Sequence, residues 1–246
     1  MQEGEKMTEQ IILSIPHSSV CFPDKDGFNM DLLDAEVVLL TDFASDEIFH
    51  SSNLSSVKSV TSRIYCDVER LPDDEESMAK YGMGIIYTRT DDGKELRRIS
   101  EAKKQEIIDR YYRPFHQKLT NIVTDKLQKY GECLIIDCHT FSDRPFLRDL
   151  DRTTPRPDIC IGTDAFHTPP ELAHRIIHFF ESEDYTVKEN SPYAGCIIPQ
   201  EYRQKNPSVH SVMVEVNRKL YMDNNKPDNK KVAILNAIMQ ELCKIL

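Results

Sequence analysis

Apolar strand-like segments alternate with amphipathic helical segments along the chain, which predicts an α/β fold, a three-layer sandwich with a mixed, largely parallel central sheet. The clearest strand signal is residues 134–136 (LII), which follow Gly131 and are apolar enough for a strand buried on both faces. Apolar runs that lead into polar residues recur at residues 11–17 and 211–218. Because open α/β sheets bind ligands beyond the carboxyl ends of their strands, these three segments predict one shared site.

Size and charge narrow the possible classes of protein. The chain has 246 residues, no internal repeat and no change in composition, which predicts a single domain over residues 1–246. Its formal net charge of −10 argues against a nucleic-acid partner, because nucleic-acid-binding surfaces are usually basic. A local cluster of arginines could still bind a small anionic substrate. The sequence does not indicate an oligomeric state.

The hydropathy pattern and the cysteines both favour the cytoplasm. No apolar run approaches the ~20 residues of a membrane span, so no membrane contact is predicted. Residues 1–10 are polar and acidic, so no signal peptide is expected. The seven cysteines include no CxxC pair, and several lie in apolar runs, which predicts reduced buried thiols.

The remaining elements follow from periodicity and from residues that start or stop helices. Ser100 is expected to cap a long helix, which Pro114 should kink or divide. Thr168 and Glu171 enclose two prolines in the pattern of a capping box. Helices are predicted at residues 31–40, 42–50, about 100–130, about 170–183 and 230–246, and further strands at residues 57–61, 85–88, 157–162, 185–188 and 196–198.

Asp42 and Asp46 lie near a predicted helix start and are candidate functional residues. Thr41 is a plausible N-cap for a helix over residues 42–50. On that helix Asp42 and Asp46 would lie four residues apart and share one face. A capping carboxylate or a solvated helix face accounts for one of them more readily than for both.

Residues 62–70 (SRIYCDVER) carry charges in a segment too apolar for an ordinary surface loop. Arg63, Asp67 and Arg70 are the charged residues of interest. A guanidinium group held in place is the usual receptor for a carboxylate, because its planar donors match the two oxygens. Surface ion pairs with neighbouring acids are the alternative explanation.

The polar residues at the strand ends form a pattern typical of a catalytic metal site. Three strand ends contribute His17, His139 and Glu215, and the helix start adds Asp42. Two imidazoles and one carboxylate leave an open position on zinc, and a separate carboxylate could act as general base for a zinc-bound water of pKa ~7. Arg63 could then stabilise the oxyanion, and Arg70 could bind a substrate carboxylate.

Other chemistries fit the sequence less well. A Ser-His-Asp triad through Ser18 or Ser19 lacks a nucleophile elbow. Cys138 and His139 are neighbours on a strand and therefore point to opposite faces. His174 and His178 share a helix face, but no third ligand follows nearby, so they are expected to be ordinary surface histidines.

Seven segments follow one another over residues 11–223: Pro16-His17-Ser18-Ser19, Thr41-Asp42 with Asp46, Ser62-Arg63 to Asp67 and Arg70, Asp137-Cys138-His139-Thr140, Pro157-Asp158 to Gly162, residues 190–195 (NSPYAG) and residues 215–221 (EVNRKLY). In this order they resemble the N-formylglutamate amidohydrolase family. The resemblance implies an α/β sandwich shared with zinc carboxypeptidases and with deacylases related to aspartoacylase. It also implies zinc-dependent hydrolysis of the amide of an N-acyl amino acid.

The resemblance also implies residue roles. It places one Zn²⁺ on His17, His139 and a carboxylate, and the general base on Glu215. Asp42 is favoured as the third ligand because it lies at the helix start nearest the strand ends, and Asp46 is the second choice. The remaining roles are substrate binding by Arg70, Asn190 and Tyr193, catalysis by Arg63, and support of a ligand or alternative ligation by Asp46 and Asp137.

The sequence departs from the usual residues of that family at Ser19, Thr140 and Glu69. Glu69 stands beside Arg70, where the family usually has Asn. The leading hypothesis is a zinc amidohydrolase for a small anionic N-acyl amino acid such as N-formylglutamate. The alternatives are a carboxypeptidase-like metallopeptidase on short peptides and a non-catalytic relative that binds a metal or ligand.

Overall fold

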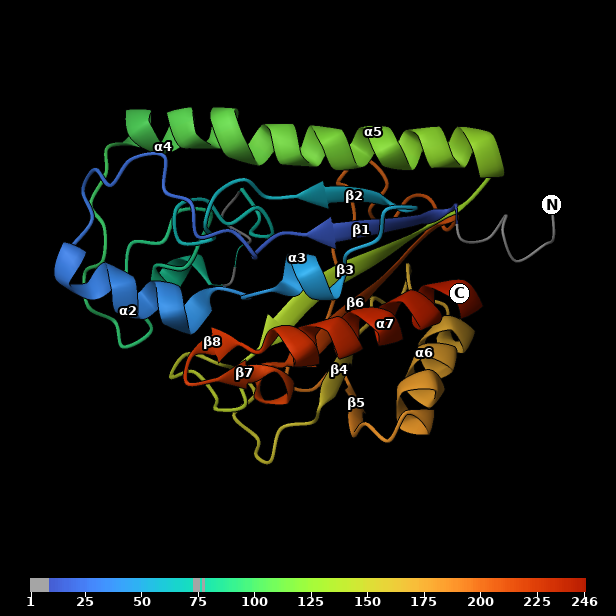
Figure 1. The fold of residues 1–246 in the computed structure, drawn as a ribbon. Helices are drawn as coiled ribbons and strands as arrows, with labels where there is room; N and C mark the ends of the chain where they lie inside the picture. Colours follow the sequence, from blue (N-terminus) through green and yellow to red (C-terminus); the bar gives the residue numbers. More distant parts are fainter. Residues whose placement is uncertain (1–8, 73–75, 77) are drawn as a thin grey trace.

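The centre of the protein is a six-stranded sheet with the order β2-β1-β3-β6-β4-β5 (Figure 1). The computed structural model describes residues 9–72, 76 and 78–246, so the prediction for the first eight residues lies outside the described residues. The strands are β1 (Ile11–Ile15), β2 (Ser55–Lys58), β3 (Cys133–Phe141), β4 (Ile159–Gly162), β5 (Val187–Glu189) and β6 (Val209–Asn217), and a separate hairpin consists of β7 (Met222–Asp223) and β8 (Lys226–Pro227).

The sheet is mixed and largely parallel, as predicted. β2, β1, β3 and β6 run parallel to one another, whereas β4 pairs antiparallel with β6 and parallel with β5. All nine residues of β3 are buried, which fits the continuous apolar run that predicted a strand covered on both faces.

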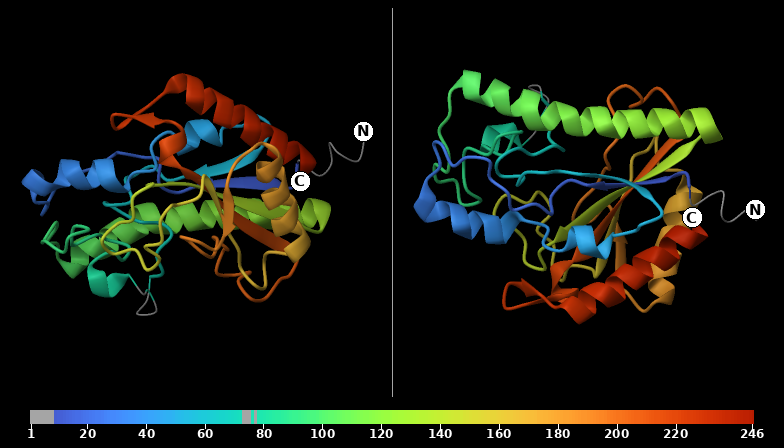
Figure 2. Two further views of the ribbon diagram at one scale, coloured as in Figure 1. Left: turned by 90° about the horizontal axis from the view of Figure 1, so that it is seen from below. Right: turned by 45° about the horizontal axis from the view of Figure 1, so that its top comes forward.

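Helices cover both faces of this sheet and produce the predicted three layers (Figure 2). One hydrophobic cluster packs α3, α6 and α7 against one face, and a second packs α2, α4 and α5 against the other. The helices are α2 (Met30–Leu40), α3 (Ser45–Ile48), α4 (Glu101–Ile107), α5 (Arg113–Tyr130), α6 (Pro170–Ser182) and α7 (Asn229–Ile245), with a π-helix η2 (Ile108–Tyr112) and 3₁₀ helices η1 (Ala79–Tyr81) and η3 (Arg218–Leu220).

The three strands with polar ends are neighbours in the sheet. β1 and β6 flank β3, and all three point the same way, so their carboxyl ends lie at one edge. The register places His139 of β3 opposite Glu215 of β6. His17 lies two residues beyond the end of β1. The prediction of one shared edge is therefore confirmed.

The helix predicted for residues 42–50 is wrong in its extent. Only Ser45–Ile48 is helical, and Thr41 is the C-cap of the preceding helix α2 instead of an N-cap. Ala44 adopts a left-handed backbone conformation with φ of 59°, which interrupts helix formation before Ser45. Asp42 consequently lies in the turn between two helices and shares no helical face with Asp46.

The long helix predicted from Ser100 to about residue 130 is confirmed, but Pro114 does not divide it. Ser100 Oγ accepts a hydrogen bond from the backbone N–H of Lys103, as a cap should. The π-helix over Ile108–Tyr112 precedes Pro114 and joins α4 to α5 as one long rod (Figure 1). A π-turn widens the helix locally, which accommodates a proline that lacks an N–H.

Several strand and cap predictions need correction. Residues 85–88 contribute only an isolated bridge at Tyr87, and residues 196–198 form no strand. Thr168 does not cap α6, because its hydroxyl donates to the carbonyl of Ser211. β3 continues through His139 to Phe141, whereas the sequence suggested an earlier end.

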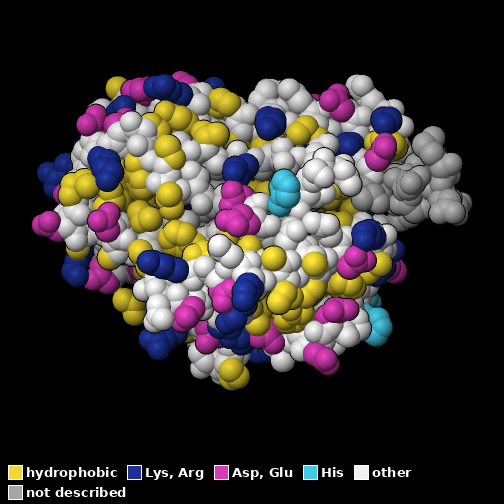
Figure 3. Space-filling model, viewed as in Figure 1, with side chains coloured by type: hydrophobic (Ala, Val, Ile, Leu, Met, Phe, Trp, Pro, Cys, Tyr) yellow, Lys and Arg dark blue, Asp and Glu magenta, His cyan; other side chains and the backbone are white. Residues whose placement is uncertain are grey.

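Lysine and arginine side chains are interspersed with acidic ones over the face in Figure 3. None of the helices among the described residues is both long enough and apolar enough to cross a bilayer.

Candidate active site

A cavity of about 590 Å³ opens at the carboxyl ends of β1, β3 and β6. His17, His139 and Glu215, one from each strand or the turn after it, line this cavity. Asp42, Arg63, Arg70 and Tyr193 also line it, so seven of the ten predicted site residues share one cavity.

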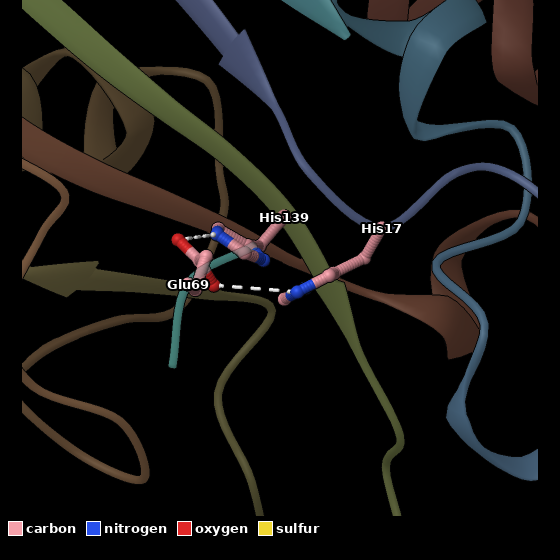
Figure 4. Close-up of side chains that lie close together, drawn as sticks. All are labelled: His17, Glu69 and His139. Atoms are coloured by element: carbon pink, nitrogen blue, oxygen red, sulfur yellow. Dashed lines mark hydrogen bonds and ion pairs between the residues drawn. The ribbon is translucent and has the colours of Figure 1, made fainter. Parts of the chain in front are cut away.

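His17, Glu69 and His139 form a compact group that could hold a metal ion (Figure 4). One donor atom from each lies within 4.8 Å of the others. Glu69 bridges the two imidazoles, with Oε1 3.1 Å from Nε2 of His139 and Oε2 3.6 Å from Nε2 of His17. Both imidazoles are buried, and their ring centroids lie 5.0 Å apart.

Asp67 supports this group from one side. Its Oδ1 lies 2.8 Å from Nε2 of His17 and accepts the backbone N–H of Glu69. Its Oδ2 accepts hydrogen bonds from Arg63 and from the Tyr87 hydroxyl. Burial alone would raise the pKa of Asp67, but the charges of His17 and Arg63 outweigh burial and lower it well below the usual value. Asp67 therefore stays ionised and fixes both histidine and arginine.

Asp42 supports the group from the other side. Its Oδ2 lies 3.2 Å from Nδ1 of His139 and accepts the backbone N–H of Thr140, and its Oδ1 accepts a hydrogen bond from Arg218. Burial would raise the pKa of Asp42, but the hydrogen bond from His139 and the charge of Arg218 lower it. Its oxygens are thus engaged within the protein, and Asp42 faces the opposite side of the His139 ring from Glu69.

His139 is surrounded by acids. Besides Asp42 and Glu69, the carboxylate of Asp137 lies 3.3 Å from its Nε2, and Asp137 is held by the backbone N–H of Ile197. Burial would lower the pKa of His139, but the carboxylates of Glu69 and Asp137 raise it well above the usual value. So much negative charge around one ring favours a cation at this place.

Glu215 is the buried acid of the site with the weakest hydrogen bonding. Its Oε2 is buried and has no hydrogen-bond partner among the described residues. Burial, assisted by the negative charges of Asp42 and Glu69, raises the pKa of Glu215 to about 8. A carboxyl group tuned toward neutral pH is suited to accepting and donating a proton.

Arg63 and Arg70 both line the cavity, but they differ in how closely they approach acidic groups of the protein. Arg63 donates to Asp67 through Nε and Nη2, and its Nη1 lies 3.9 Å from Asp42. Arg70 Nε lies 3.5 Å from Asp67, beyond a good hydrogen bond, and its Nη1 lies 3.9 Å from Glu76. Arg70 therefore keeps the donors that a substrate carboxylate would need.

Of the other predicted site residues, Tyr193 lines the cavity, whereas Asn190 and Asp46 do not. The Tyr193 hydroxyl lies within hydrogen-bond distance of Asp149 and Arg156, which fixes the ring at the cavity wall. Asn190 does not line the cavity, and its side-chain amide bonds Thr163 instead. Asp46 is outside as well and pairs with Lys58 at 2.7 Å.

Sequence reasoning missed Glu69 as a metal-site residue. The signal was present in the charged residues of an otherwise apolar segment, where Asp67 and Glu69 lie two positions apart. The sequence marks Glu69 only as a departure from the family's usual Asn, whereas the structure brings its carboxylate between the two imidazoles.

Comparisons with known sequences agree with this architecture. A sequence profile of the family described as "N-formylglutamate amidohydrolase" matches residues 9–222. An N-formylglutamate deformylase from Pseudomonas putida is 26% identical over 231 residues, which cover 88% of this chain and 83% of that protein. One from Pseudomonas aeruginosa is 27% identical over 223 residues, which cover 87% of this chain and 80% of that protein.

Two solved structures share the fold. The crystal structure of an N-formylglutamate amidohydrolase from Ralstonia eutropha superposes with a TM-score of 0.85 at 22% identity, covering 96% of this chain and 92% of that one. A protein from Agrobacterium tumefaciens superposes with a TM-score of 0.67 at 19% identity, covering 99% of this chain and 93% of that one.

Proposed function

The chain belongs to the N-formylglutamate amidohydrolase family, and on this basis we propose that it hydrolyses the amide bond of a small anionic N-acyl amino acid such as N-formylglutamate. The observation that carries the proposal is that His17, Glu69 and His139 lie together in the lining of one cavity. The named relatives are deformylases of that substrate.

The three residues fit a catalytic zinc ion. Two imidazoles and one carboxylate are the ligand set of catalytic zinc sites that keep one position open. Nε2 of His17 lies 2.8 Å from Asp67 Oδ1, whereas its Nδ1 is buried without a hydrogen-bond partner among the described residues, so Nδ1 is the nitrogen left for a partner outside the protein. We therefore assign Zn²⁺ to His17, Glu69 and His139, so that Glu69 takes the place predicted for Asp42.

Zinc, when bound, supplies Lewis acidity that polarises the amide carbonyl and lowers the pKa of water. Glu215 acts as general base at Oε2: it takes a proton from the attacking water and passes it to the leaving nitrogen. With a cation bound beside it, Glu215 would have a lower pKa and would be in the ionised form that a base requires.

Arg63 and Arg70 have separate roles in the proposed reaction. Arg63 is anchored by Asp67 and stabilises negative charge that develops on the amide oxygen. Arg70, with its weakly engaged guanidinium, binds the α-carboxylate of the substrate. Tyr193, fixed by Arg156 and Asp149, lines the path of the substrate.

We also propose that the chain is a single catalytic domain that works in the cytoplasm. All seven cysteines are free, and five of them are buried. Free thiols persist in reducing compartments, where disulfides are rare.

The test is formate release from N-formylglutamate by the purified full-length protein with added zinc. We expect turnover in the wild type, and loss of both turnover and bound zinc in His17→Ala. Asp46→Asn is the matched control, because Asp46 lies outside the cavity. Cleavage of short peptides in place of the N-formyl amide would favour the peptidase alternative, and zinc binding without any hydrolysis would favour a non-catalytic relative.

A further inference from the structure

Arg148 lines the cavity from the loop between β3 and β4 (residues 142–158). Its guanidinium donates from Nε to the backbone carbonyl of Asp91 at 2.8 Å and from Nη1 to the backbone carbonyl of Tyr81. Neither carbonyl carries a formal charge, and Nη2 has no hydrogen-bond partner among the described residues. Arg148 therefore offers the cavity a positive charge and a free donor group.

The other three arginines that line the cavity all lie near acids of the protein. Arg63 and Arg218 donate hydrogen bonds to the carboxylates of Asp67 and Asp42, respectively. Arg70 Nε lies 3.5 Å from Asp67. Of the lining arginines, Arg148 is thus the one without an ion pair to any residue that the structure describes.

The acids closest to Arg148 along the cavity lining are engaged with other groups. Asp149 pairs with Arg156, and the carboxylate of Asp91 accepts the backbone N–H groups of Leu147 and Arg148. Asp91 therefore holds the backbone of Arg148 in place instead of neutralising its guanidinium. A donor that is held in place before binding loses little conformational freedom when a ligand arrives.

Glu36 of α2 senses the charge of Arg148 without pairing with it. Burial raises the pKa of Glu36 to about 6, and the charge of Arg148 acts in the opposite direction. Both carboxyl oxygens of Glu36 lie 3.2 Å from the backbone nitrogen of Asp91, whose N–H they accept. Glu36 is therefore bound to the backbone, and the guanidinium stays available.

Arg70 and Arg148 contact the two ends of one short segment. Arg70 Nη1 lies 3.9 Å from Glu76, whereas Arg148 donates to the carbonyl of Tyr81. Met78 connects these ends through its backbone, because its N–H donates to Glu76 and its carbonyl accepts the N–H of Tyr81. Met78 also lines the cavity, so both guanidinium groups border the same side of it.

Two cations on one side of a cavity match a substrate with two carboxylates. An N-formyl derivative of an acidic amino acid carries an α-carboxylate and, a few carbon atoms away, a side-chain carboxylate. A carboxylate that enters a cavity loses hydration and needs a charged donor to offset the loss. Arg148 can provide that donor without breaking an ion pair, and a planar guanidinium suits the two oxygens of a carboxylate.

We propose that Arg148 binds the side-chain carboxylate of the substrate while Arg70 binds the α-carboxylate. Arg148 thereby sets a preference for N-formyl derivatives of acidic amino acids over those of neutral ones. This proposal rests on the proposed function, which supplies the amide cleavage. Arg148 acts on substrate selection and takes no part in the chemistry at the amide.

N-formyl-L-glutamate and N-formyl-L-glutamine test the assignment, because they are nearly equal in size and differ by one side-chain charge. With the zinc-loaded full-length protein, we expect kcat/KM for N-formylglutamate to exceed that for N-formylglutamine by about ten- to a hundredfold. This range corresponds to one hydrogen bond to a charged group. Hydrolysis of both compounds with equal kcat/KM overturns the role of Arg148 and leaves the proposed function intact.

Arg148→Gln should remove this preference. Its kcat/KM for N-formylglutamate should fall by about ten- to a hundredfold, whereas its kcat/KM for N-formylglutamine should change little. Arg144→Gln is the matched control, because Arg144 belongs to the same loop, is exposed and lies outside the cavity lining. A folded Arg148→Gln protein with the substrate preference of the wild type contradicts the proposal.

The α-carboxamide of N-formylglutamate shows which arginine binds which carboxylate. In Arg148→Gln, the loss of kcat/KM on changing the α-carboxylate to a carboxamide should equal the loss in the wild type. If Arg148→Gln instead abolishes the discrimination at the α-carboxylate and keeps that at the side chain, the assignment of Arg148 is overturned.

A binding measurement separates this proposal from the proposed function. If the wild type releases formate from neither compound, the proposed function fails. Calorimetry on the same zinc-loaded protein then compares the binding of N-formylglutamate with that of N-formylglutamine. Tighter binding of N-formylglutamate that is lost in Arg148→Gln supports the role of Arg148, and equal or weaker binding overturns it.

Discussion

Asp42 and Glu69 hold opposite nitrogens of the same imidazole, with Asp42 Oδ2 3.2 Å from Nδ1 of His139 and Glu69 Oε1 3.1 Å from Nε2. A carboxylate on Nδ1 fixes the ring orientation and keeps the proton on that nitrogen, which leaves Nε2 for a metal ion. Under the proposed function this relationship gives the two acids different tasks, with Glu69 as a ligand of the metal and Asp42 as the residue that orients His139.

Asp42→Asn should weaken zinc binding without abolishing it. Removal of a carboxylate that orients a histidine ligand typically costs about 10–100-fold in metal affinity. Competition with a chromogenic chelator measures the change. Asp46→Asn, which alters an acid paired with Lys58 on the surface, should match the wild type. Wild-type affinity in Asp42→Asn would contradict the orienting role.

Glu69→Gln should lower zinc affinity more than Asp42→Asn does. An amide is a poor zinc ligand, and the loss of one of three protein ligands removes a direct bond to the ion. Metal analysis after dialysis measures the ratio of zinc to protein. The reverse order of the two variants would restore Asp42 as the third ligand, as the sequence alone suggested.

Glu215→Gln should retain zinc and lose turnover. Glutamine fills the same volume but accepts no proton, and the loss of a general base costs roughly 10²–10⁴-fold in rate. The measurement pairs kcat with metal content of the same preparation. Near-normal kcat in a zinc-replete Glu215→Gln protein would remove Glu215 from its role.

Arg70→Met should impair substrates that carry an α-carboxylate. Loss of a charged hydrogen-bonding partner costs about a hundredfold in kcat/KM at a desolvated site. The corresponding α-carboxamides provide the control, because they offer no carboxylate to Arg70 and should lose little. A similar loss for carboxylate and carboxamide substrates would indicate a general disturbance of the cavity instead of a lost contact.

Glu36 should make stability depend on pH. This residue of α2 is buried and accepts the backbone N–H of Asp91. Burial raises the pKa of Glu36 to about 6, above the usual value near 4.3 of an unfolded chain. The stabilising contribution of the protonated carboxyl is therefore complete below that unfolded value and is lost as the pH rises through about 6.

Glu36→Gln should accordingly unfold at a similar temperature to the wild type near pH 4 and at a higher one at pH 7. The expected gain at pH 7 is on the order of 1 kcal/mol, which corresponds to roughly 2–4 °C for a domain of this size. Asp34→Asn on the exposed side of the same helix is the control. A difference that does not grow between pH 4 and pH 7 would refute the expectation.

The sheet was predictable because hydrophobic periodicity is encoded locally. The apolar run of β3 and the matching runs of β1 and β6 identify buried strands without any knowledge of distant contacts. The same runs place His17, His139 and Glu215 at one edge once parallel neighbours are assumed. The start of the helix capped by Ser100 was equally predictable, because the capping pattern spans only a few residues.

Residues in irregular segments could not be placed in this way. The sequence predicts Asp42 at a helix start, but Ala44 has a left-handed backbone conformation and Asp42 lies in a turn. Asn190 occurs in a motif that resembles the family, yet its side chain bonds Thr163. Tyr193 of the same motif lines the cavity, and Asn190 does not. Turns have no periodicity, so the direction of each side chain depends on contacts made elsewhere in the chain.

The amino-acid sequence by itself determined the α/β class, the family and the two imidazoles of the candidate metal site, because each follows from short patterns along the chain. Only the tertiary structure decided which carboxylate joins them. Glu69 and Asp42 are separated from His139 by 70 and 97 residues. The turn that carries Glu69 is brought to the strand ends by Asp67, whose bonds to His17, Arg63 and Tyr87 exist only in the folded chain.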